Sequence, residues 1–340
     1  MIPQDKSAAV THGLREAFGL TTFEDIRMLS SGLGSALVFR IVVRGSPYLL
    51  RIVTRPNAMN DPTRHFTIMR LAAEAGLAPR VRYSSIEDGI CVSDFVEAAP
   101  LSSTEARARV PGVLRTLHAL TPFPKALNYV TVDAIIRKFQ AANLLPKDEI
   151  GEVFNRYGQL SAVYPRLDSD MVSCHNDLKP ENILFDGHRI WLVDWKAAFT
   201  NDRYFDLAIV ANFLAANGAD ENAYLQDYFG QPPDPYQLSR FFLMRQVMHM
   251  MAAAVYLLLG SSGKPVDQNE KLPSFQDFHR RIWAGEVNLA DSGMKTVYGR
   301  VHWEQLLENV RHPRFDEALR IVSDRHAGSE GIPRLLPPAH

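Results

Sequence analysis

Three polar residues on one short stretch of the chain have the types and spacing that phosphoryl transfer requires. Asp177 precedes Asn182 by five positions, and Asp194 follows Asn182 after twelve more. Phosphoryl transfer asks little covalent chemistry of a protein, since it needs a carboxylate to orient and deprotonate the acceptor hydroxyl and oxygen ligands for Mg²⁺. We predict that Asp177 fills the first role and that Asn182 and Asp194 hold the metal.

The residues between the two predicted metal ligands indicate how these ligands are brought together. An apolar strand at 183–185 and a second strand at 189–193, with bulky apolar residues in its middle, flank an Asp-Gly pair at 186–187, and this arrangement is typical of a tight β-hairpin. A tight hairpin places its two ends side by side, so one amide and one carboxylate are expected to face one metal site. The alternative is a polar turn beside a hydrophobic hairpin that binds no ligand.

The same stretch resembles the catalytic and metal loops of the protein-kinase-like fold. More narrowly, the sequence His-x-Asp-x-x-x-x-Asn at 175–182, followed by Asp-Trp at 194–195, resembles the aminoglycoside phosphotransferase and choline kinase superfamily. The resemblance implies an ATP-dependent kinase that uses ATP and Mg²⁺ and phosphorylates a hydroxyl of a small molecule, choline-like, ethanolamine-like, another small alcohol or an antibiotic.

The resemblance also suggests roles for other residues near this motif. Lys179 is placed to reach the γ-phosphate as a second catalytic residue, with a solvated loop lysine as the alternative. His175 is expected to support the loop, because Asp177 already supplies the base. Asp206 stands where the family has a structural Asp that accepts backbone amides from the catalytic loop, and a plain N-terminal helix carboxylate is the alternative.

The expected fold class is α+β. The resemblance implies a bilobal protein-kinase-like fold, with a small N-terminal antiparallel-sheet lobe that binds nucleotide at 1–97. A larger, mainly helical C-terminal lobe at 98–340 would carry the catalytic loop and the acceptor site. The boundary is placed at the Ala-Ala-Pro sequence of residues 98–100.

Two features of the first lobe predict contacts to the phosphates of the nucleotide. Gly32, Gly34 and Ser35 lie in a turn between two predicted strands, where backbone amides can approach a phosphate without side-chain obstruction. A plain glycine-containing hairpin turn is the alternative. Arg51 is the one charge in the strand expected at 48–53, where kinase folds place a cation for the α- and β-phosphates. A solvent-facing arginine is the alternative there.

Adenine is expected to bond to the backbone of a hinge that includes Asp94, Phe95 and Val96, although an ordinary sheet edge fits the same pattern. The helix expected at 64–75 is the one that supplies an acid to pair with the strand cation in this fold. Its expected acidic position is not obvious, since His65 stands near it, and the partner of Arg51 stays open.

Composition limits the other classes of function. The chain has 340 residues, 46% of them hydrophobic, which suggests about two domains. A net charge of −1 argues against a dedicated nucleic-acid binder. Cys91 and Cys174 lie in apolar contexts as expected for buried free thiols, which fits a reducing cytoplasm. Residues 1–10 show no signal peptide, and the longest apolar run, 250–259, predicts a buried helix with no membrane span. The oligomeric state stays open.

The second half of the chain reads as mostly helical. We expect a helix from Ser102 or Ser103 to about 120 that bends or breaks at Pro111, a loop at 196–200, and late helices at 303–309 and 315–326.

The acceptor and the enzyme class keep alternatives. Late aromatic residues such as Trp283 and Trp303 fit helix packing better than a cage for a quaternary ammonium. Lys196 stands where choline kinases tend to have Glu, so we predict a neutral or monocationic small alcohol rather than an aminoglycoside. A protein Ser/Thr kinase-like enzyme is less favoured, because Asn176 replaces the usual Arg and no Ala-Pro-Glu motif flanks Asp206. A nucleotide-binding pseudokinase is also less favoured, because such a protein need not keep Asp177, Asn182 and Asp194, and all three are present here.

Overall fold

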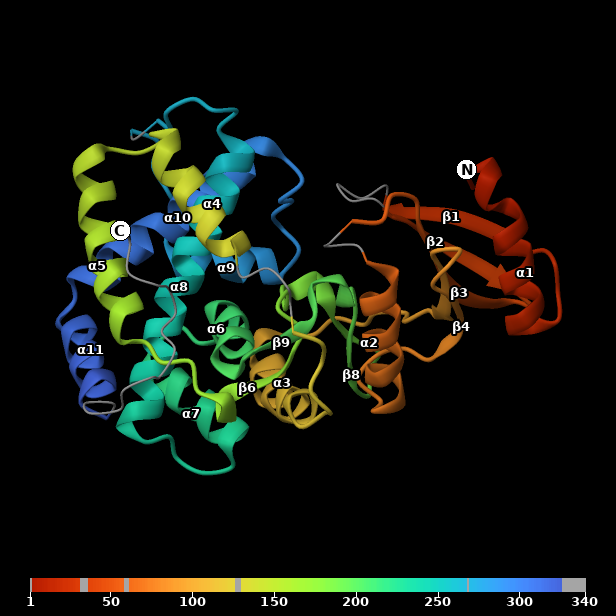
Figure 1. Ribbon diagram of the computed structural model, residues 1–340, viewed down its shortest axis with the longest axis horizontal. Helices are drawn as coiled ribbons and strands as arrows, with labels where there is room; N and C mark the ends of the chain where they lie inside the picture. Colours follow the sequence, from red (N-terminus) through yellow and green to blue (C-terminus); the bar gives the residue numbers. More distant parts are fainter. Residues whose placement is uncertain (1, 31–35, 58–60, 126–129, 268, 326–340) are drawn as a thin grey trace. The chain divides into compact units, whose positions relative to one another are not determined.

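The structure, a computed structural model, describes residues 2–30, 36–57, 61–125, 130–267 and 269–325. The predicted phosphate turn with Gly32, Gly34 and Ser35 lies outside these described residues. The chain divides into two compact units (Figure 1). The first unit joins three separate segments: Met1–Leu101, Leu120–Pro124 and His175–Phe199. The second unit takes the rest: Ser102–Ala119, Lys125–Cys174 and Thr200–His340.

The first unit is built on a five-stranded antiparallel sheet. The strand order is β1-β2-β3-β5-β4. The strands and the helices of this part are α1 (Ser7–Phe18), β1 (Asp25–Ser30), β2 (Ala36–Val43), β3 (Ser46–Val53), α2 (Pro62–Glu74), β4 (Val81–Ser85) and β5 (Ile90–Asp94), with a short 3₁₀ turn, η1 (Gln4–Lys6), before α1.

The two faces of this sheet bury different sets of side chains. One apolar cluster contains Leu14 of α1 together with Leu50 and Ile52 of β3. A second cluster contains Phe66 of α2 with Ala36, Val53 and Cys91. Because successive strand residues point to opposite faces, Arg51, between Leu50 and Ile52, lies on the face that α2 covers. The alternating pattern of β3 therefore positions the strand cation under α2.

The predicted hairpin also belongs to this unit. It consists of β7 (Ile183–Phe185) and β8 (Ile190–Leu192), which pair antiparallel, and it lies between the 3₁₀ turns η3 (Pro180–Asn182) and η4 (Trp195–Ala197). Backbone hydrogen bonds tie the hairpin to the N-terminal segment. The amide of Leu192 donates to the carbonyl of Leu77 at 2.8 Å, and that of Ala99 donates to Phe185 at 2.7 Å.

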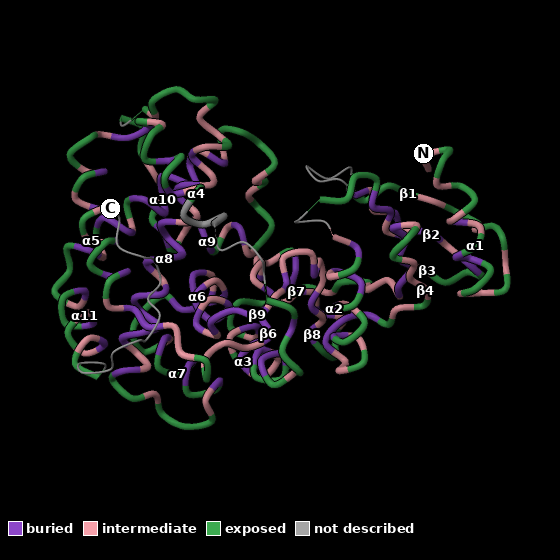
Figure 2. Tube along the Cα trace, viewed as in Figure 1, coloured by how far each residue is buried: buried purple, intermediate pink, exposed green. Residues whose placement is uncertain are grey.

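The second unit is mainly helical and packs around one long central helix, α8, whose side chains are largely buried (Figure 2). Helix α8 is long and apolar enough to cross a membrane, but it carries the buried Arg240 and contacts α4, α6, α10 and α11 as a core helix does. The elements of this unit are α3 (Ser103–His118), α4 (Val130–Ala142), α5 (Lys147–Val163), η2 (Asp168–Asp170), β6 (Met171–Cys174), β9 (Phe199–Asp202), α6 (Arg203–Leu214), α7 (Gly218–Phe229), α8 (Pro235–Gly260), α9 (Phe275–Trp283), α10 (Ser292–Arg311) and α11 (Pro313–Arg325).

Several sequence expectations for the second half of the chain were wrong. Of the bend or break expected at Pro111, the break does not occur: α3 continues through it, because Val110 and Leu114 on either side are fully buried and their packing outweighs the missing hydrogen bond. The expected loop at 196–200 instead contains η4 and the start of β9, which pairs with β6. Helix α10 begins at Ser292, well before the expected start at residue 303, and Asp291 caps it by accepting from the amide of Met294 at 2.9 Å.

Candidate active site

Arg51 and the predicted metal ligand Asp194 form an ion pair within the first unit. Arg51 Nη1 lies 3.3 Å from Asp194 Oδ1, and the two side chains are 12% and 22% exposed. Lys196 Nζ lies 2.5 Å from the other carboxylate oxygen of Asp194. The partner of Arg51 that the sequence left open is therefore the carboxylate of the metal loop, which follows it far along the chain.

The backbone and the charge of Asp194 are both unusual. Its φ of 63° and ψ of 58° lie in the left-handed region, which is uncommon for a residue other than glycine and is found preferentially at functional sites. Burial raises the pKa of its carboxyl, but Arg51 and Lys196 more than offset this effect and lower the pKa to about 2. Asp194 is consequently an anion at neutral pH, which is the form in which a carboxyl binds a metal.

The predicted base and the second predicted ligand contact each other directly. Asn182 Nδ2 donates to the backbone carbonyl of Asp177 at 2.6 Å and to Asp177 Oδ2 at 3.1 Å. Both donors of this amide point to Asp177, which leaves Asn182 Oδ1 as its acceptor atom. Across the hairpin the amide of Val193 donates to the carbonyl of Asn182 at 3.0 Å. Asn182 therefore lies beside Val193, which directly precedes Asp194, so the hairpin brings its two ends together as predicted.

Asp177 lies in a partly desolvated position. Burial raises the pKa of its carboxyl, and the positive charge of Lys179 is the largest effect that opposes the rise. A raised pKa suits a group that accepts a proton from a hydroxyl, because the base then works closer to neutral pH. Lys179 therefore acts electrostatically on the predicted base, while its contact with a phosphate stays a prediction.

Three neighbouring side chains hold the loop in place. His175 is fully buried, and its Nε2 donates to the carbonyl of Val193 at 2.9 Å. Asn176 adopts a φ of 64°, and its Nδ2 donates to the carbonyls of Ala197 and Phe199 at 3.1 and 3.3 Å. The ring of Trp195 lies 4.7 Å from that of His175, centroid to centroid. Position 176, which the sequence marked only as a departure from protein kinases, ties the catalytic loop to the segment after the metal loop.

Helix α2 places a histidine beside the cation where an acid was expected. The first turn of α2 contains no acidic residue. His65 on this helix is buried, and its pKa falls to about 3, first because of burial and then because of Arg51. It is therefore neutral at pH 7 and adds no charge to the pair of Arg51 and Asp194. The absence of an acidic residue at the start of this helix was the sequence signal that Arg51 has its partner elsewhere.

The predicted hinge residues show mixed contacts. The carboxylate of Asp94 accepts from Arg82 Nε at 2.6 Å, and the amide of Asp94 donates to the carbonyl of Arg80 at 2.9 Å. The guanidinium of Arg40 lies 5.4 Å from the ring centre of Phe95. The side chain of Asp94 thus joins β4 to β5, and adenine binding by the backbone of Asp94, Phe95 and Val96 stays a prediction.

The donors of this site fit Mg²⁺. The ion prefers oxygen ligands and is usually held by one or two carboxylates together with substrate phosphates. Asp194 supplies an anionic carboxylate and Asn182 an amide oxygen, from the two ends of one hairpin. Both oxygens of Asp194 already contact cations in this structure, so Arg51 and Lys196 would compete with a metal for that carboxylate.

An antiparallel five-stranded sheet, a strand cation and an acidic loop before a short hairpin together define the protein-kinase-like class of α+β fold. Within this class, a model of the phosphotransferase enzyme family matches residues 25–240, and the chain belongs to that family.

One curated protein is similar to about half of the chain. The chain is 28% identical over 183 residues to ethanolamine kinase 2 of Mus musculus, a match that covers 48% of this chain and 45% of that protein. The chain thus matches less than half the length of this curated relative.

Two solved structures extend the comparison over most of the chain. A choline/ethanolamine kinase family protein from Mesorhizobium loti has a TM-score of 0.64 and 21% identity, and the match covers 94% of this chain and 99% of that one. The macrolide 2′-phosphotransferase MphH of Brachybacterium faecium has a TM-score of 0.54 and 18% identity, with 83% and 98% covered. At these identities the two structures show the shared fold.

Proposed function

We propose that the protein transfers the γ-phosphoryl group of ATP to a hydroxyl of a small molecule, with Mg²⁺ as cofactor. The observation that carries this proposal is the contact of Asn182 Nδ2 with Asp177 Oδ2 at 3.1 Å, beside a hairpin that ends in the anionic Asp194. This contact supports Asp177 as the base, and the hairpin supports Asn182 and Asp194 as the neutral and the charged metal ligand. Mg²⁺, when bound, neutralises phosphate charge and orients the β- and γ-phosphates.

Each residue has a defined part in this reaction. The acceptor oxygen attacks the γ-phosphorus, the bond from that phosphorus to the β,γ-bridging oxygen breaks, and ADP leaves. Asp177 accepts the hydroxyl proton, and its partly desolvated position raises the pKa of its carboxyl and so makes it a better base. Arg51 holds the α- and β-phosphates, and Lys179 stabilises charge on the γ-phosphate. His175 and Asn176 keep the loop in shape.

The acceptor we propose is a small alcohol that is neutral or carries one positive charge, such as choline or ethanolamine. The likeness to ethanolamine kinase 2 supports this class. The near-neutral total charge also offers no broad acidic surface for a polycation. We place the enzyme in a reducing cytoplasm, since both of its cysteines are free and buried. Division into a nucleotide lobe at 1–97 and an acceptor lobe at 98–340 is part of the same proposal.

The test is release of ADP from ATP and Mg²⁺ with a panel of acceptors: choline, ethanolamine, neutral sugars and polyols, thiamine-like alcohols, kanamycin-type aminoglycosides and a macrolide. Acceptor-dependent ADP release with a small alcohol, absent in Asp177→Asn, is the expected result. Turnover on an aminoglycoside or a macrolide alone would overturn the acceptor class but keep the kinase reaction. Magnesium-dependent nucleotide binding with no turnover on any acceptor would favour a pseudokinase.

A further inference from the structure

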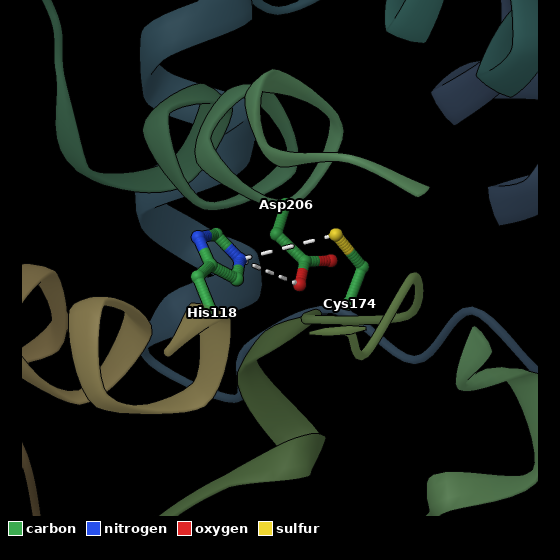
Figure 3. Close-up of side chains that lie close together, drawn as sticks. All are labelled: His118, Cys174 and Asp206. Carbon is green, nitrogen blue, oxygen red and sulfur yellow. Dashed lines mark hydrogen bonds and ion pairs between the residues drawn. The ribbon is translucent and has the colours of Figure 1, made fainter. Parts of the chain in front are cut away.

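A second group of potential metal ligands lies in the helical unit, apart from the residues assigned above. His118 at the end of α3, Cys174 at the end of β6 and Asp206 in α6 converge on one point (Figure 3). One ligand atom from each lies within 4.8 Å of the other two, and all three residues are buried. In the part of the chain that the structure describes, this is the one cluster of at least three histidine, cysteine or acidic ligands that meets this spacing.

The distances within this cluster fit a tetrahedral ion. His118 Nε2 lies 3.3 Å from Asp206 Oδ2 and 3.9 Å from Cys174 Sγ. Zinc bonds of about 2.0–2.3 Å put neighbouring ligand atoms of a tetrahedral site roughly 3.3–3.6 Å apart. The nitrogen–oxygen separation already has this value, the nitrogen–sulfur separation exceeds it by a few tenths of an ångström, and the sulfur–oxygen separation is within 4.8 Å. A combination of thiolate, imidazole and carboxylate favours Zn²⁺ over Mg²⁺, which prefers oxygen alone.

The charges of the cluster also balance for a divalent ion. Asp206 is completely buried, and Cys174 lies beside it with no exposed surface. In the metal-free structure Cys174 Sγ donates to the carbonyls of Asn201 and Asp202, so the sulfur carries its proton there. A thiolate and a carboxylate together carry two negative charges, which a divalent cation cancels. Binding would release the thiol proton to solvent and leave the buried cluster neutral.

The surrounding contacts resemble those that orient a metal-bound histidine. Tyr228 Oη lies 2.7 Å from His118 Nδ1, so the nitrogen remote from the cluster has its own partner and the ring orientation is fixed. The backbone carbonyls of Asn201 and Asp202 lie 3.5 and 3.6 Å from Cys174 Sγ. A tetrahedral ion would take one of these carbonyls as its fourth ligand.

We propose that His118, Cys174 and Asp206 form a structural binding site for one Zn²⁺-type ion. Such an ion would join α3, β6 and α6 at the residue that directly precedes His175 in the chain. The site is separate from the proposed magnesium site and does not depend on phosphoryl transfer. The metal-free form of the same cluster is a hydrogen-bonded chain from Tyr228 through His118 to Asp206.

The experiment measures the metal content of the full-length protein. Because the cluster is buried, the protein is produced in zinc-supplemented medium, and a second sample is unfolded and refolded with ZnCl₂ under reducing conditions. Both samples are then washed with a weak chelator and excess Mg²⁺. We expect about one zinc per chain, and after refolding with Co²⁺ a thiolate-to-cobalt charge-transfer absorption in the near ultraviolet.

Matched variants assign the ion to this cluster. Cys174→Ala should lose the zinc and the charge-transfer band, whereas Cys91→Ala, which changes the other buried cysteine, should keep both. Asp194→Asn should also keep the zinc, since it changes only the proposed magnesium site. Less than about one tenth of a zinc per chain in both wild-type samples would overturn the proposal, and so would equal zinc in Cys174→Ala. The zinc content of the wild-type samples alone decides whether the protein binds the ion, so the test holds even if a variant does not fold.

Discussion

Replacement of Arg51 by methionine should weaken ATP binding and leave adenosine binding unchanged. The side chain is 12% exposed and lies on the α2 face of the sheet. Its Nη1 contacts Asp194 at 3.3 Å, which is long for a charge-assisted bond. Its Nε is buried and has no hydrogen-bond partner among the described residues. The guanidinium thus retains donor capacity that a phosphate can use, and methionine keeps the length of the side chain without it.

The size of the effect follows from the bonds lost. Hydrogen bonds to charged groups contribute about 1.5–3 kcal/mol, which corresponds to roughly a 10- to 150-fold weaker Kd for ATP. Loss of Arg51 also removes the largest charge that keeps the pKa of the Asp194 carboxyl low. Part of the effect could therefore act through Mg²⁺ bound at Asp194, and ATP without magnesium separates the two contributions.

Calorimetric titration gives the Kd of wild type and variant for MgATP, for ATP in the presence of a chelator, and for adenosine. Arg27→Met is the matched control, because Arg27 is an exposed arginine on the edge strand β1 of the same sheet. We expect Arg51→Met to weaken both forms of ATP and the control variant to weaken none. Equal weakening of ATP and adenosine would refute the reasoning, since Arg51 would then act on the fold.

Three further predictions concern the loop and the helical unit. Asp177→Asn should lower kcat by at least about 100-fold, because the base is lost, and raise Tm, because burial penalises the ionised carboxyl of Asp177. Steady-state kinetics and thermal melts measure the two effects, and a lower Tm would contradict the reasoning about burial. Lys196→Gln should lower the Mg²⁺ concentration for half-maximal nucleotide binding by about two- to fivefold, since its amine competes for Asp194; an unchanged midpoint in magnesium titrations would speak against this competition. Burial lowers the pKa of His279 to about 3, so the unfolded chain binds the extra proton between pH 6.5 and 3 and stability is lost as pH falls through this window. In urea unfolding from pH 7 to 4.5, His279→Leu should reduce the slope of stability against pH by up to about 1.4 kcal/mol per unit, and identical slopes would disprove it.

Local patterns were sufficient to predict the hairpin and the sheet. The short apolar runs on either side of Asp186 and Gly187 predicted β7 and β8, and the structure confirms that this hairpin brings Asn182 next to Val193. The strand that contains Arg51 was expected at residues 48–53, and β3 contains all of these residues. Such signals depend on residues close in sequence, so a single chain reveals them.

Contacts between distant segments could not be predicted in this way. The ion pair of Arg51 with Asp194 joins residues far apart in the chain, and no local pattern encodes it. The strands β6 and β9 are short and stabilise each other, so neither has a clear signal alone. The convergence of His118, Cys174 and Asp206 likewise depends on the packing of α3 and α6, which periodicity does not specify.

The segmented make-up of the first unit has a consequence for how the protein is made. Chains grow from the N-terminus on the ribosome, and local units fold as they emerge. Here the carbonyl of Leu77 accepts from the amide of Leu192, and Phe185 accepts from Ala99, so the contacts of the first unit are complete only when residues 175–199 have been made. The intervening helices are therefore translated while the first unit still lacks this segment. A pause before residue 199 would prolong that exposed state, and chaperone binding during synthesis is expected to concentrate there.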